Sequence, residues 1–324
     1  MSNQPLRIVD LFAGTGAFSL AFHQTGKATS VWANDFYDPS ETIYNLNNPP
    51  IKLTNADIFT VPSESIPQHD ILCAGFNCQP FSIAGKQLGW EDERSNSFWK
   101  LVRILEHHKT PIIILENVKN LASHDKGRTF KIICQELTKL GYHYKFKILN
   151  TSEITGVPQN RERIYIVGFQ NPELAEKFSL DFDEVDLRPI TAFLESNPDS
   201  KYYYTDRLKI YTTVNKDITK HINTNTLYQF RRYYVRENKS NVCPTLTANM
   251  GTGGHNVPLL KDDKGIRKLT PRECFNLQGF PPTYKLPTDL SDAKLYKLAG
   301  NAVSVPVVRL IADRVTDLIR PDDH

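Results

Sequence analysis

The first 170 residues alternate short apolar runs with amphipathic stretches, and this alternation limits the folds open to the chain. We predict strands at 6–11, 29–34, 70–75, 112–116, 143–149 and 163–169, and helices near 16–25, 39–46, 96–109 and 127–140. The runs ILCAG and IIIL are continuously apolar, as in strands that are buried on both faces. The alternation therefore predicts a doubly wound α/β fold with a mostly parallel sheet, in which ligands bind at the carboxyl ends of the strands.

The composition changes beyond the last of these strands. Residues 186–285 are rich in Tyr, Asn, Thr and Arg, contain short strand-like pieces and a cluster of glycines, and show no long helical period. They predict a smaller strand-and-loop domain. The tail AVSVPVVRLIADRVTDLI returns to helical spacing, and such a helix needs a partner surface, for which the α/β body is the candidate. We therefore predict a body formed by residues 1–185 and completed by 271–324, with 186–270 as a separate domain.

The net charge of +3 conceals an uneven distribution of charge. Residues 201–272 hold fourteen Lys and Arg against five Asp and Glu, a balance of +9, whereas the rest of the chain carries −6. A solvated basic face is one interpretation of this segment. The other is a surface that neutralises phosphates, because such contacts supply most of the affinity of proteins for nucleic acid that does not depend on sequence.

Composition argues against three other classes of protein. No apolar run reaches the ~20 residues of a membrane span, and the N-terminus MSNQPLRIVDLF lacks the charged and apolar parts of a secretory signal. The five cysteines are scattered and odd in number, and no Cys/His cluster has the spacing of a zinc site, so we expect no metal. We therefore expect reduced thiols in a cytoplasm, one of which is available for catalysis.

The first candidate ligand site is the segment DLFAGTGAF, residues 10–18, between a strand and a helix. Glycines there allow a tight turn and a close approach of the backbone to a ligand. Asp35, at the end of the second strand, is placed to bind ribose hydroxyls. The segment fits NAD, a nucleotide or S-adenosylmethionine, or simply a turn that needs glycine. A cofactor without phosphates fits best, because the sequence here lacks both the GxGxxG pattern and a Gly-Lys-Ser/Thr ending.

Three further motifs follow predicted strands and carry reactive side chains. Cys78, in GFNCQPFS, lies at the end of a strand and before a polar loop, unlike Cys73, which lies inside the strand and is interpreted as core filler. Glu116 follows the apolar run IIIL, where a carboxylate is costly unless it is paired or used, although a helix cap is an alternative. Arg161 and Arg163, in QNRER, are expected on one side of an extended chain. There they hold a base carbonyl or a phosphate, or join a surface ladder of ion pairs.

Taken together, these segments resemble the ordered motifs of the DNA (cytosine-5) methyltransferases of bacterial restriction-modification systems. The resemblance runs from about residue 6 to residue 315 and rests on six segments in the family's order: DLFAGTGAF, CQPFS, ENV, QNRER, RKLTPRECFNLQGFP and LAGNAV. It implies the S-adenosylmethionine-dependent methyltransferase fold, with residues 186–270 as a DNA-recognition domain. The implied reaction is methyl transfer from S-adenosylmethionine to carbon 5 of a flipped-out cytosine in a short specific sequence of duplex DNA.

The resemblance also assigns roles to the candidate catalytic residues. Cys78 is the nucleophile, and addition of its thiolate to carbon 6 of cytosine makes carbon 5 nucleophilic. Glu116 stabilises the charge that develops at ring nitrogen 3. Arg163 holds the carbonyl oxygen of the base, and Arg161 lies close to Cys78.

By the same resemblance, ten residues form the cofactor site: Asp10, Phe12, Gly14, Gly16, Asp35, Phe36, Asp57, Ile58, Asn301 and Val303. Asp35 binds the ribose, and Asp57 meets the adenine amino group. Phe36 stacks on adenine, with an ordinary core aromatic as the alternative interpretation.

Ten further residues are expected to contact DNA: Gln79, Ser82, Lys86, Arg94, Arg231, Arg232, Arg236, Thr245, Asn249 and Gly251. The first four belong to segment 79–97, which resembles the loop that closes over the flipped base. The other six belong to the recognition domain, where arginine reads guanine and Gln or Asn reads adenine. Lysines in that domain chiefly position the protein on phosphates.

Two positions depart from the family's pattern. Asn77 stands where proline normally precedes the nucleophile, and Ala17 stands where a third glycine is common. Asparagine restores a backbone freedom and an amide hydrogen that proline removes. A catalytically impaired DNA-binding homologue and a tRNA cytosine methyltransferase of the same fold therefore stay open as alternatives, with a nicotinamide dehydrogenase more distant. We expect a monomeric cytoplasmic enzyme that acts on double-stranded DNA beside a restriction endonuclease, with no membrane contact.

Overall fold

The structure is a computed structural model, and it describes residues 4–48, 50–76, 97–206, 211–218, 226–231, 233–238, 241–251 and 257–319. The chain divides into two compact units. Unit 1 comprises Met1–Leu149, Glu162–Phe182 and Val307–His324, and unit 2 comprises Asn150–Arg161 and Asp183–Pro306.

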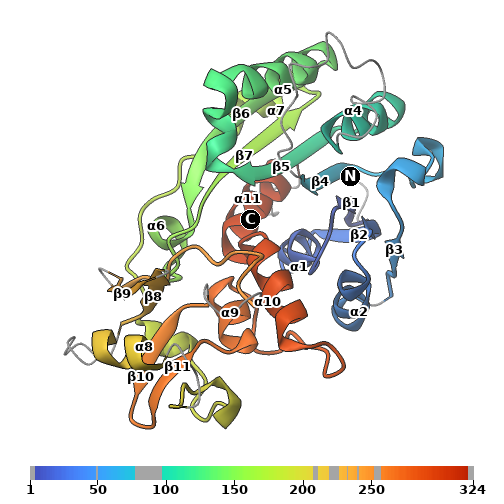
Figure 1. Ribbon diagram of the computed structural model, residues 1–324. Coiled ribbons are helices and arrows are strands. Elements are labelled where there is room, and N and C mark those ends of the chain that lie inside the picture. The colour runs from blue at the N-terminus through green and yellow to red at the C-terminus, as the bar shows by residue number, and fades with distance from the viewer. Residues whose placement is uncertain are drawn as a thin grey trace, which may run out of the picture. The chain divides into compact units, whose positions relative to one another are not determined.

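Unit 1 is built on a seven-stranded sheet in the order β3-β2-β1-β4-β5-β7-β6 (Figure 1). Its strands are β1 (Leu6–Leu11), β2 (Ala28–Asp35), β3 (Leu53–Asn55), β4 (Ile71–Gly75), β5 (Ile112–Val118), β6 (His143–Asn150) and β7 (Glu162–Phe169). The neighbours from β3 to β5 are parallel, whereas β7 is antiparallel to β5. The predicted doubly wound, mostly parallel sheet is therefore confirmed. The sequence missed β3, because three residues are too few to show a period.

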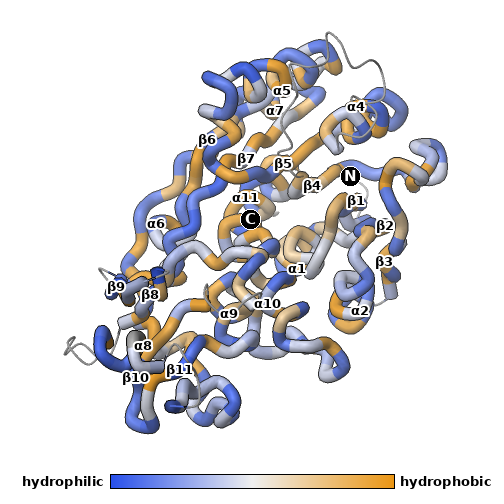
Figure 2. The backbone as a smooth tube through the Cα atoms, in the orientation of Figure 1, coloured by the Kyte–Doolittle hydropathy of each residue, from blue (hydrophilic) through white to orange (hydrophobic). Residues whose placement is uncertain are grey.

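The helices of unit 1 are α1 (Ala17–His23), α2 (Asp38–Asn47), α4 (Ser97–His108), α5 (Arg128–Lys139), α7 (Pro172–Lys177) and all but the first two residues of α11 (Val305–Ile319). One face of the sheet packs with α4 and α5 in a single apolar cluster that includes Val9, Leu72, Ile113, Leu101 and Ile133. Successive side chains of a strand point to opposite faces. Asp10, next to Val9, therefore points to the opposite face, where Ser19 of α1 binds it. The apolar runs of β4 and β7 are orange in Figure 2.

Unit 2 contains a four-stranded antiparallel sheet in the order β11-β10-β8-β9. Its strands are β8 (Tyr228–Arg231), β9 (Tyr234–Glu237), β10 (Leu259–Asp262) and β11 (Gly265–Lys268), and its helices are α6 (Thr151–Thr155), α8 (Tyr211–Ile218), α9 (Pro271–Leu277) and α10 (Asp292–Asn301). The sheet packs with α8 around Val214, Ile218, Tyr228, Val235 and Leu259. The predicted smaller strand-rich region is confirmed, but the sequence missed α8, whose eight residues span only two turns.

Single turns of 3₁₀ helix complete the secondary structure. They are η1 (Ile58–Thr60), η2 (Ser63–Ser65), η4 (Lys119–Ala122), η5 (His124–Gly127), η6 (Ile190–Phe193) and η7 (Ser200–Tyr202). The first matters for the site, because it immediately follows the short strand β3.

The compact units differ from the domains expected from composition. Residues 150–161 join unit 2, where Gln159 forms a parallel bridge with Cys243. Residues 271–306 also join unit 2, where Arg267 of β11 donates two hydrogen bonds, of 2.8 and 2.7 Å, to Glu273 of α9. The amphipathic tail returns to unit 1 from Val307 onward, as its apolar stripe requires. Composition shows which residues are apolar, but it does not show which segment each of them contacts.

The stretch Asp292–Ile319 is long and apolar enough by composition to compare with a membrane span. However, 72% of its most apolar window is buried inside the protein, as in the core helix of a folded domain. Two helices divide the stretch, and the longer, α11, has 15 residues, fewer than the ~20 that a span requires.

Candidate active site

The turn after β1 has the conformation that its glycines predict. Phe12, Gly14 and Gly16 have φ angles of 56°, 53° and 72°, in the left-handed region. A Cβ at Gly16 would lie 2.8 Å from Asn48 Nδ2 and 2.9 Å from the Tyr44 ring. Only glycine fits there, and α1 begins directly after it.

The carboxylate of Asp35, at the end of β2, holds this turn. The amide of Gly14 donates to Oδ2 at 2.8 Å, and the amide of Tyr37 donates to Oδ1 at 2.9 Å. Burial raises the pKa of Asp35, and these backbone hydrogen bonds oppose the rise. Each oxygen keeps capacity to accept a ribose hydroxyl. Phe36, the next residue, is 68% exposed, so the alternative interpretation of its ring as a core aromatic is wrong.

Asp10 is fully buried beneath the same turn. Ser19 of α1 donates to Asp10 Oδ2 from its hydroxyl at 2.7 Å and from its amide at 3.2 Å. The Ser19 hydroxyl also lies 3.0 Å from the Tyr44 hydroxyl. Burial raises the pKa of Asp10 to about 7. These hydrogen bonds connect Asp10 to α1 beneath the turn, and its membership of the cofactor site stays a prediction.

Asp57 and Ile58 follow β3. Asp57 accepts a hydrogen bond of 3.1 Å from Phe59 and caps η1, and Ile58 is buried. Because β1, β2 and β3 are parallel neighbours, the turn after β1, Asp35–Phe36 and Asp57–Ile58 lie at one edge of the sheet. Eight of the ten predicted cofactor residues thus come together in unit 1. The other two, Asn301 and Val303, lie in unit 2 at the end of α10.

A second group lies where β4 and β5 end. Gly75, the last residue of β4, pairs in register with Glu116 of β5. Glu116 is 8% exposed, and its Oε1 lies 3.2 Å from Nε of Arg163 in β7. Arg163 also donates from Nη1 to the carbonyl of Glu162 at 2.9 Å. Glu116 is therefore a paired carboxylate within a strand, and the alternative of a helix cap is wrong.

Asn117 is a member of this group that sequence reasoning did not single out. Its Nδ2 donates to the carbonyl of Phe76 at 2.7 Å, and its Oδ1 accepts from the amide of Val118 at 2.8 Å. Phe76 stands two residues before Cys78, so Asn117 fixes the point where that segment leaves the sheet. The signal was available, because Asn117 belongs to the ENV motif. Six residues named above in this segment lie outside the described residues: Asn77, Cys78, Gln79, Ser82, Lys86 and Arg94.

The described part of the chain contains four cysteines, all of them free: Cys73, Cys134, Cys243 and Cys274. Burial raises the thiol pKa of each of the four. A raised pKa makes a thiol a poor nucleophile, because the thiolate is the reactive form. Cys73 is fully buried, which confirms its interpretation as core filler.

Arg161 belongs to unit 2 and is 2% exposed. Its Nη1 donates to the carbonyl of Leu246 at 2.9 Å, and its Nη2 donates to the carbonyls of Gly300 and Ala302 at 3.2 and 2.7 Å. Arg161 thus binds backbone carbonyls, whereas Arg163 pairs with a carboxylate. Its predicted place beside Cys78 stays a prediction.

The β8–β9 hairpin carries two of the predicted DNA contacts. Arg236 lies opposite Gln229 and donates to its Oε1 at 3.3 Å, and Arg231 lies opposite Tyr234. These four side chains share the outer face, since their neighbours Tyr228 and Val235 belong to the apolar core of unit 2. The outer face therefore presents two guanidinium groups, an amide and an aromatic ring that is 55% exposed. Arg232 lies outside the described residues.

The remaining predicted DNA contacts lie in the segment 245–251. The Thr245 hydroxyl donates to the carbonyl of Asn160 at 2.6 Å, and the Thr247 hydroxyl donates to Oδ1 of Asn249 at 2.6 Å. A Cβ at Gly251 would lie 2.8 Å from Cα of Ala293, so this segment packs closely on α10.

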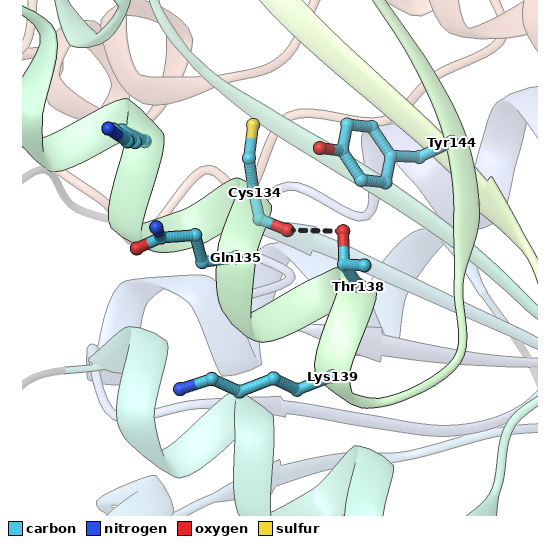
Figure 3. Close-up of a pocket in the computed structure, with 6 residues that line it drawn as sticks. Cys134, Gln135, Thr138, Lys139 and Tyr144 are labelled. Carbon is cyan, nitrogen blue, oxygen red and sulfur yellow. Dashed lines mark hydrogen bonds between the residues drawn. The ribbon is translucent and has the colours of Figure 1, made fainter.

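A surface hollow of about 430 Å³ lies over α5 and β6 (Figure 3). Its lining is Lys131, Cys134, Gln135, Thr138, Lys139 and Tyr144, with the Thr138 hydroxyl donating to the carbonyl of Cys134 at 2.9 Å. It contains none of the residues predicted to carry chemistry.

Comparison with known proteins agrees with this arrangement. Residues 6–317 match the profile of the family described as C-5 cytosine-specific DNA methylase. The Type II methyltransferase M.Bsp6I of Bacillus sp. (strain RFL6) is 48% identical over 96% of this chain and 98% of its own length. M.HhaI of Haemophilus parahaemolyticus is 36% identical over 95% of this chain and 93% of its own length.

Solved structures share the fold at lower identity. A DNMT2 mutant from Spodoptera frugiperda superimposes with a TM-score of 0.76 at 21% identity, covering 96% of this chain and 99% of that one. Dnmt2 of S. pombe gives a TM-score of 0.72 at 20% identity, covering 99% and 100%. The chain therefore belongs to the family of C-5 cytosine-specific DNA methylases, enzymes that methylate carbon 5 of cytosine.

Proposed function

We propose that this protein transfers a methyl group from S-adenosylmethionine to carbon 5 of a flipped-out cytosine in a short specific sequence of duplex DNA, with Cys78 as the nucleophile. The observation that carries the proposal is the buried pair of Glu116 and Arg163. It lies beside the end of β4, where the chain leads into Cys78.

The proposed chemistry uses each of these groups once. The Cys78 thiolate adds to carbon 6, and the electron pair of the 5,6 double bond makes carbon 5 nucleophilic. Glu116 donates a proton to ring nitrogen 3, and Arg163 donates hydrogen bonds to the carbonyl oxygen, so both oppose the negative charge that develops on the ring. Carbon 5 takes the methyl group with release of S-adenosylhomocysteine and then loses its own proton to a base. Elimination restores the double bond, releases the Cys78 thiolate and returns the proton of nitrogen 3 to Glu116.

S-adenosylmethionine supplies an electrophilic methyl group on a sulfonium. The edge at the ends of β1, β2 and β3 fits its nucleoside: Asp35 offers carboxylate oxygens to the ribose, and the exposed ring of Phe36 offers a stacking surface for adenine. Gly14 leaves room for the ligand, since a Cβ there would meet only Asp35 and Phe12, both at 3.9 Å. We propose that Asp57 belongs to this site, and that Asn301 and Val303 of unit 2 are also cofactor residues.

Duplex DNA is the proposed substrate, bound by Arg231, Arg236 and the segment 245–251 of residues 186–270. The basic balance of residues 201–272 supports this, because it suits a polyanion. We further propose a cytoplasmic monomer that is paired with a restriction endonuclease, since the relatives are Type II methyltransferases.

Covalent trapping tests the proposal directly. Duplex DNA with 5-fluorocytosine in the target site is expected to form a complex with the protein and S-adenosylmethionine that survives denaturation, because fluorine cannot leave as the proton does. Cys78→Ala is expected to abolish the complex, and Cys134→Ala, at a half-buried thiol, to retain it.

Each other outcome of this experiment has a defined meaning. Cofactor and DNA binding without trapping would favour the catalytically impaired DNA-binding homologue. In a parallel methylation assay that offers both substrates, methylation of tRNA and not of duplex DNA would contradict the assigned substrate.

A further inference from the structure

Three of the buried polar side chains in unit 2 are bonded to the same two segments: Gln159 is 0% exposed, Arg161 2% and Gln278 0%. Burial of amide and guanidinium groups costs free energy unless hydrogen bonds replace those with water. Their partners therefore show what these side chains hold together. Those partners include Leu246, in the predicted DNA segment, and the end of α10, next to the predicted cofactor residues. Gln159 Nε2 also donates to the carbonyl of Leu277, at the end of α9, at 2.6 Å.

The two glutamines form a relay of three hydrogen bonds. The amide of Leu246 donates to Gln159 Oε1 at 3.2 Å, and Gln159 Nε2 donates to Gln278 Oε1 at 3.1 Å. Gln278 Nε2 then donates to the carbonyl of Ala299 at 2.6 Å. Each glutamine accepts a hydrogen bond at Oε1 and donates one from Nε2, so all three bonds run in the same direction, from Leu246 to α10.

Arg161 makes a second connection between the same two places. It donates to the carbonyl of Leu246 from Nη1, and to the carbonyls of Gly300 and Ala302 from Nη2. The N–H and the C=O of Leu246 are thus both held, each by a different side chain that also leads to residues 299–302.

A glycine allows the two segments to touch. A Cβ at Gly300 would lie 2.2 Å from the carbonyl carbon and oxygen of Thr247 and 2.6 Å from the amide of Ala248. The backbone of segment 245–251 therefore lies directly on α10 one residue before Asn301, with no side chain between them.

We infer that Gln159, Arg161 and Gln278 are positioning residues that hold the predicted DNA segment 245–251 and the predicted cofactor residues Asn301 and Val303 as one rigid block. The inference rests on the proposed function, because it takes the roles of both segments from it. It deepens that function, because the same three side chains then influence both the affinity for the cofactor and the binding of DNA.

Gln278→Met tests the inference, because methionine keeps the shape of the side chain and removes the relay. The dissociation constant of S-adenosylhomocysteine, measured by calorimetry, is expected to rise roughly tenfold, the effect of one lost buried hydrogen bond. Hydrogen exchange at the Leu246 amide is expected to accelerate. Gln159→Met is expected to behave alike, and the double variant to lose no more affinity than either single variant, because all three break the same relay.

Tyr296→Phe is the matched control. Tyr296 is on α10 and 1% exposed, and its hydroxyl donates to the carbonyl of Leu269 at 2.5 Å, outside the relay. It is expected to lower stability without changing cofactor affinity. The inference is wrong if Tyr296→Phe weakens cofactor binding as much as Gln278→Met does. It is also wrong if the fold-changes in the dissociation constant caused by the two glutamine variants multiply in the double variant.

A second variant guards against a failure to fold. Gln159→Glu keeps an acceptor for Leu246 and breaks the bond to Gln278, so it carries the same expectation for S-adenosylhomocysteine as Gln278→Met. Failure of the proposed function would look different. In that case the unmodified protein itself would bind no S-adenosylhomocysteine. If only the inference fails, the unmodified protein binds S-adenosylhomocysteine and the variants bind it with the same affinity.

Discussion

Glu116 and Arg163 differ in burial from a charged pair close beside them. Their side chains are 10% and 14% exposed, whereas Glu162, next to Arg163, pairs with Lys119 at 36% and 49%. Removing two charges from water costs more than their attraction commonly returns, so a buried pair is weak evidence for a stabilising role. The burial of this pair therefore fits the proposed contact of both side chains with a reacting ligand.

Glu116→Gln is expected to lower kcat by at least about 100-fold, because the amide keeps the shape of the side chain and removes its charge and acid function. Transfer of a tritiated methyl group to duplex DNA measures the effect. Glu162→Gln is the matched control, since it removes an exposed carboxylate close by, and its kcat should stay within severalfold. Equal losses in both variants would contradict the role of Glu116.

Asp10 predicts a dependence of stability on pH. Burial raises its pKa to about 7 in the folded protein, from 3.8 for a carboxyl in water. The folded state therefore keeps a proton that the unfolded state releases, and the free energy of unfolding falls as pH rises from about 4 to about 7. Asp10→Asn keeps an acceptor for Ser19 and cannot ionise. Between pH 4 and pH 7, urea unfolding is expected to show the free energy of unfolding of the variant rising relative to that of the unmodified protein, by on the order of 4 kcal/mol at most. The same dependence of this free energy on pH in both proteins would contradict the expectation.

The β8–β9 hairpin has two faces of different composition. Its inner face belongs to the core of unit 2, and its outer face carries Arg231, Arg236 and Gln229. A two-stranded ribbon fits the major groove, where arginine donates two hydrogen bonds to guanine. This composition fits the proposed reading of bases by the outer face.

Arg231→Ala is therefore expected to reduce discrimination at one base pair by about 10- to 100-fold while S-adenosylmethionine binding persists. Methylation of a pool of randomised duplexes, read by bisulfite sequencing, measures this. Arg231→Lys keeps the charge and loses the paired donors, so it should lose discrimination but keep more affinity than the alanine variant. An unchanged sequence preference in both variants would exclude base reading by Arg231.

The elements also show what the sequence could predict. Strands β1, β4 and β7 were expected within one residue of their ends, because continuous apolar runs identify buried strands. The importance of Gln278 was not visible, although it lies in a recognised motif. A polar residue at the end of a helix is ordinary in sequence, and only the structure shows that this one is fully buried and bonded to Gln159. Pairing across 119 positions leaves no local pattern.

At the scale of the whole molecule, the basic balance of residues 201–272 predicts a strong effect of salt on DNA affinity. Each phosphate contact adds about 0.9 to the slope of log Kd against log salt concentration. Lys261 lies on β10, and Lys264 lies in the turn after it. Lys261→Gln combined with Lys264→Gln is expected to lower this slope by about 2 and to weaken the binding of all DNA sequences equally.

Fluorescence anisotropy of labelled duplexes in a series of KCl concentrations measures the slope. Lys139→Ala, at an exposed lysine of α5 in unit 1, is the control and should leave it unchanged. A slope that stays the same in the double variant would remove these two lysines from the phosphate contacts.

The division of the molecule was the least predictable feature. The change of composition after β7 suggested one inserted domain, but unit 2 also takes residues 150–161. The hydrogen bonds of Gln159 and Arg161 with Leu246 explain this, since they join positions 85 or more residues apart. The meeting of the turn after β1, Asp35 and Asp57 at one edge of the sheet followed from the order of the strands and was predictable. The sharing of predicted cofactor residues between units was not, because it depends on which unit each segment contacts.

The interleaving of the two units has a consequence for synthesis of the protein. The chain passes from one unit to the other four times, and its last helix, α11, returns to unit 1. Proteins are made from the N-terminus, and domains fold as units. Unit 1, which bears Glu116 and Asp35, therefore lacks its last helix on the ribosome until residues beyond Val307 have emerged. A chain released before that point lacks α11, so we expect unit 1 to fold as a whole only after synthesis of the chain is nearly complete.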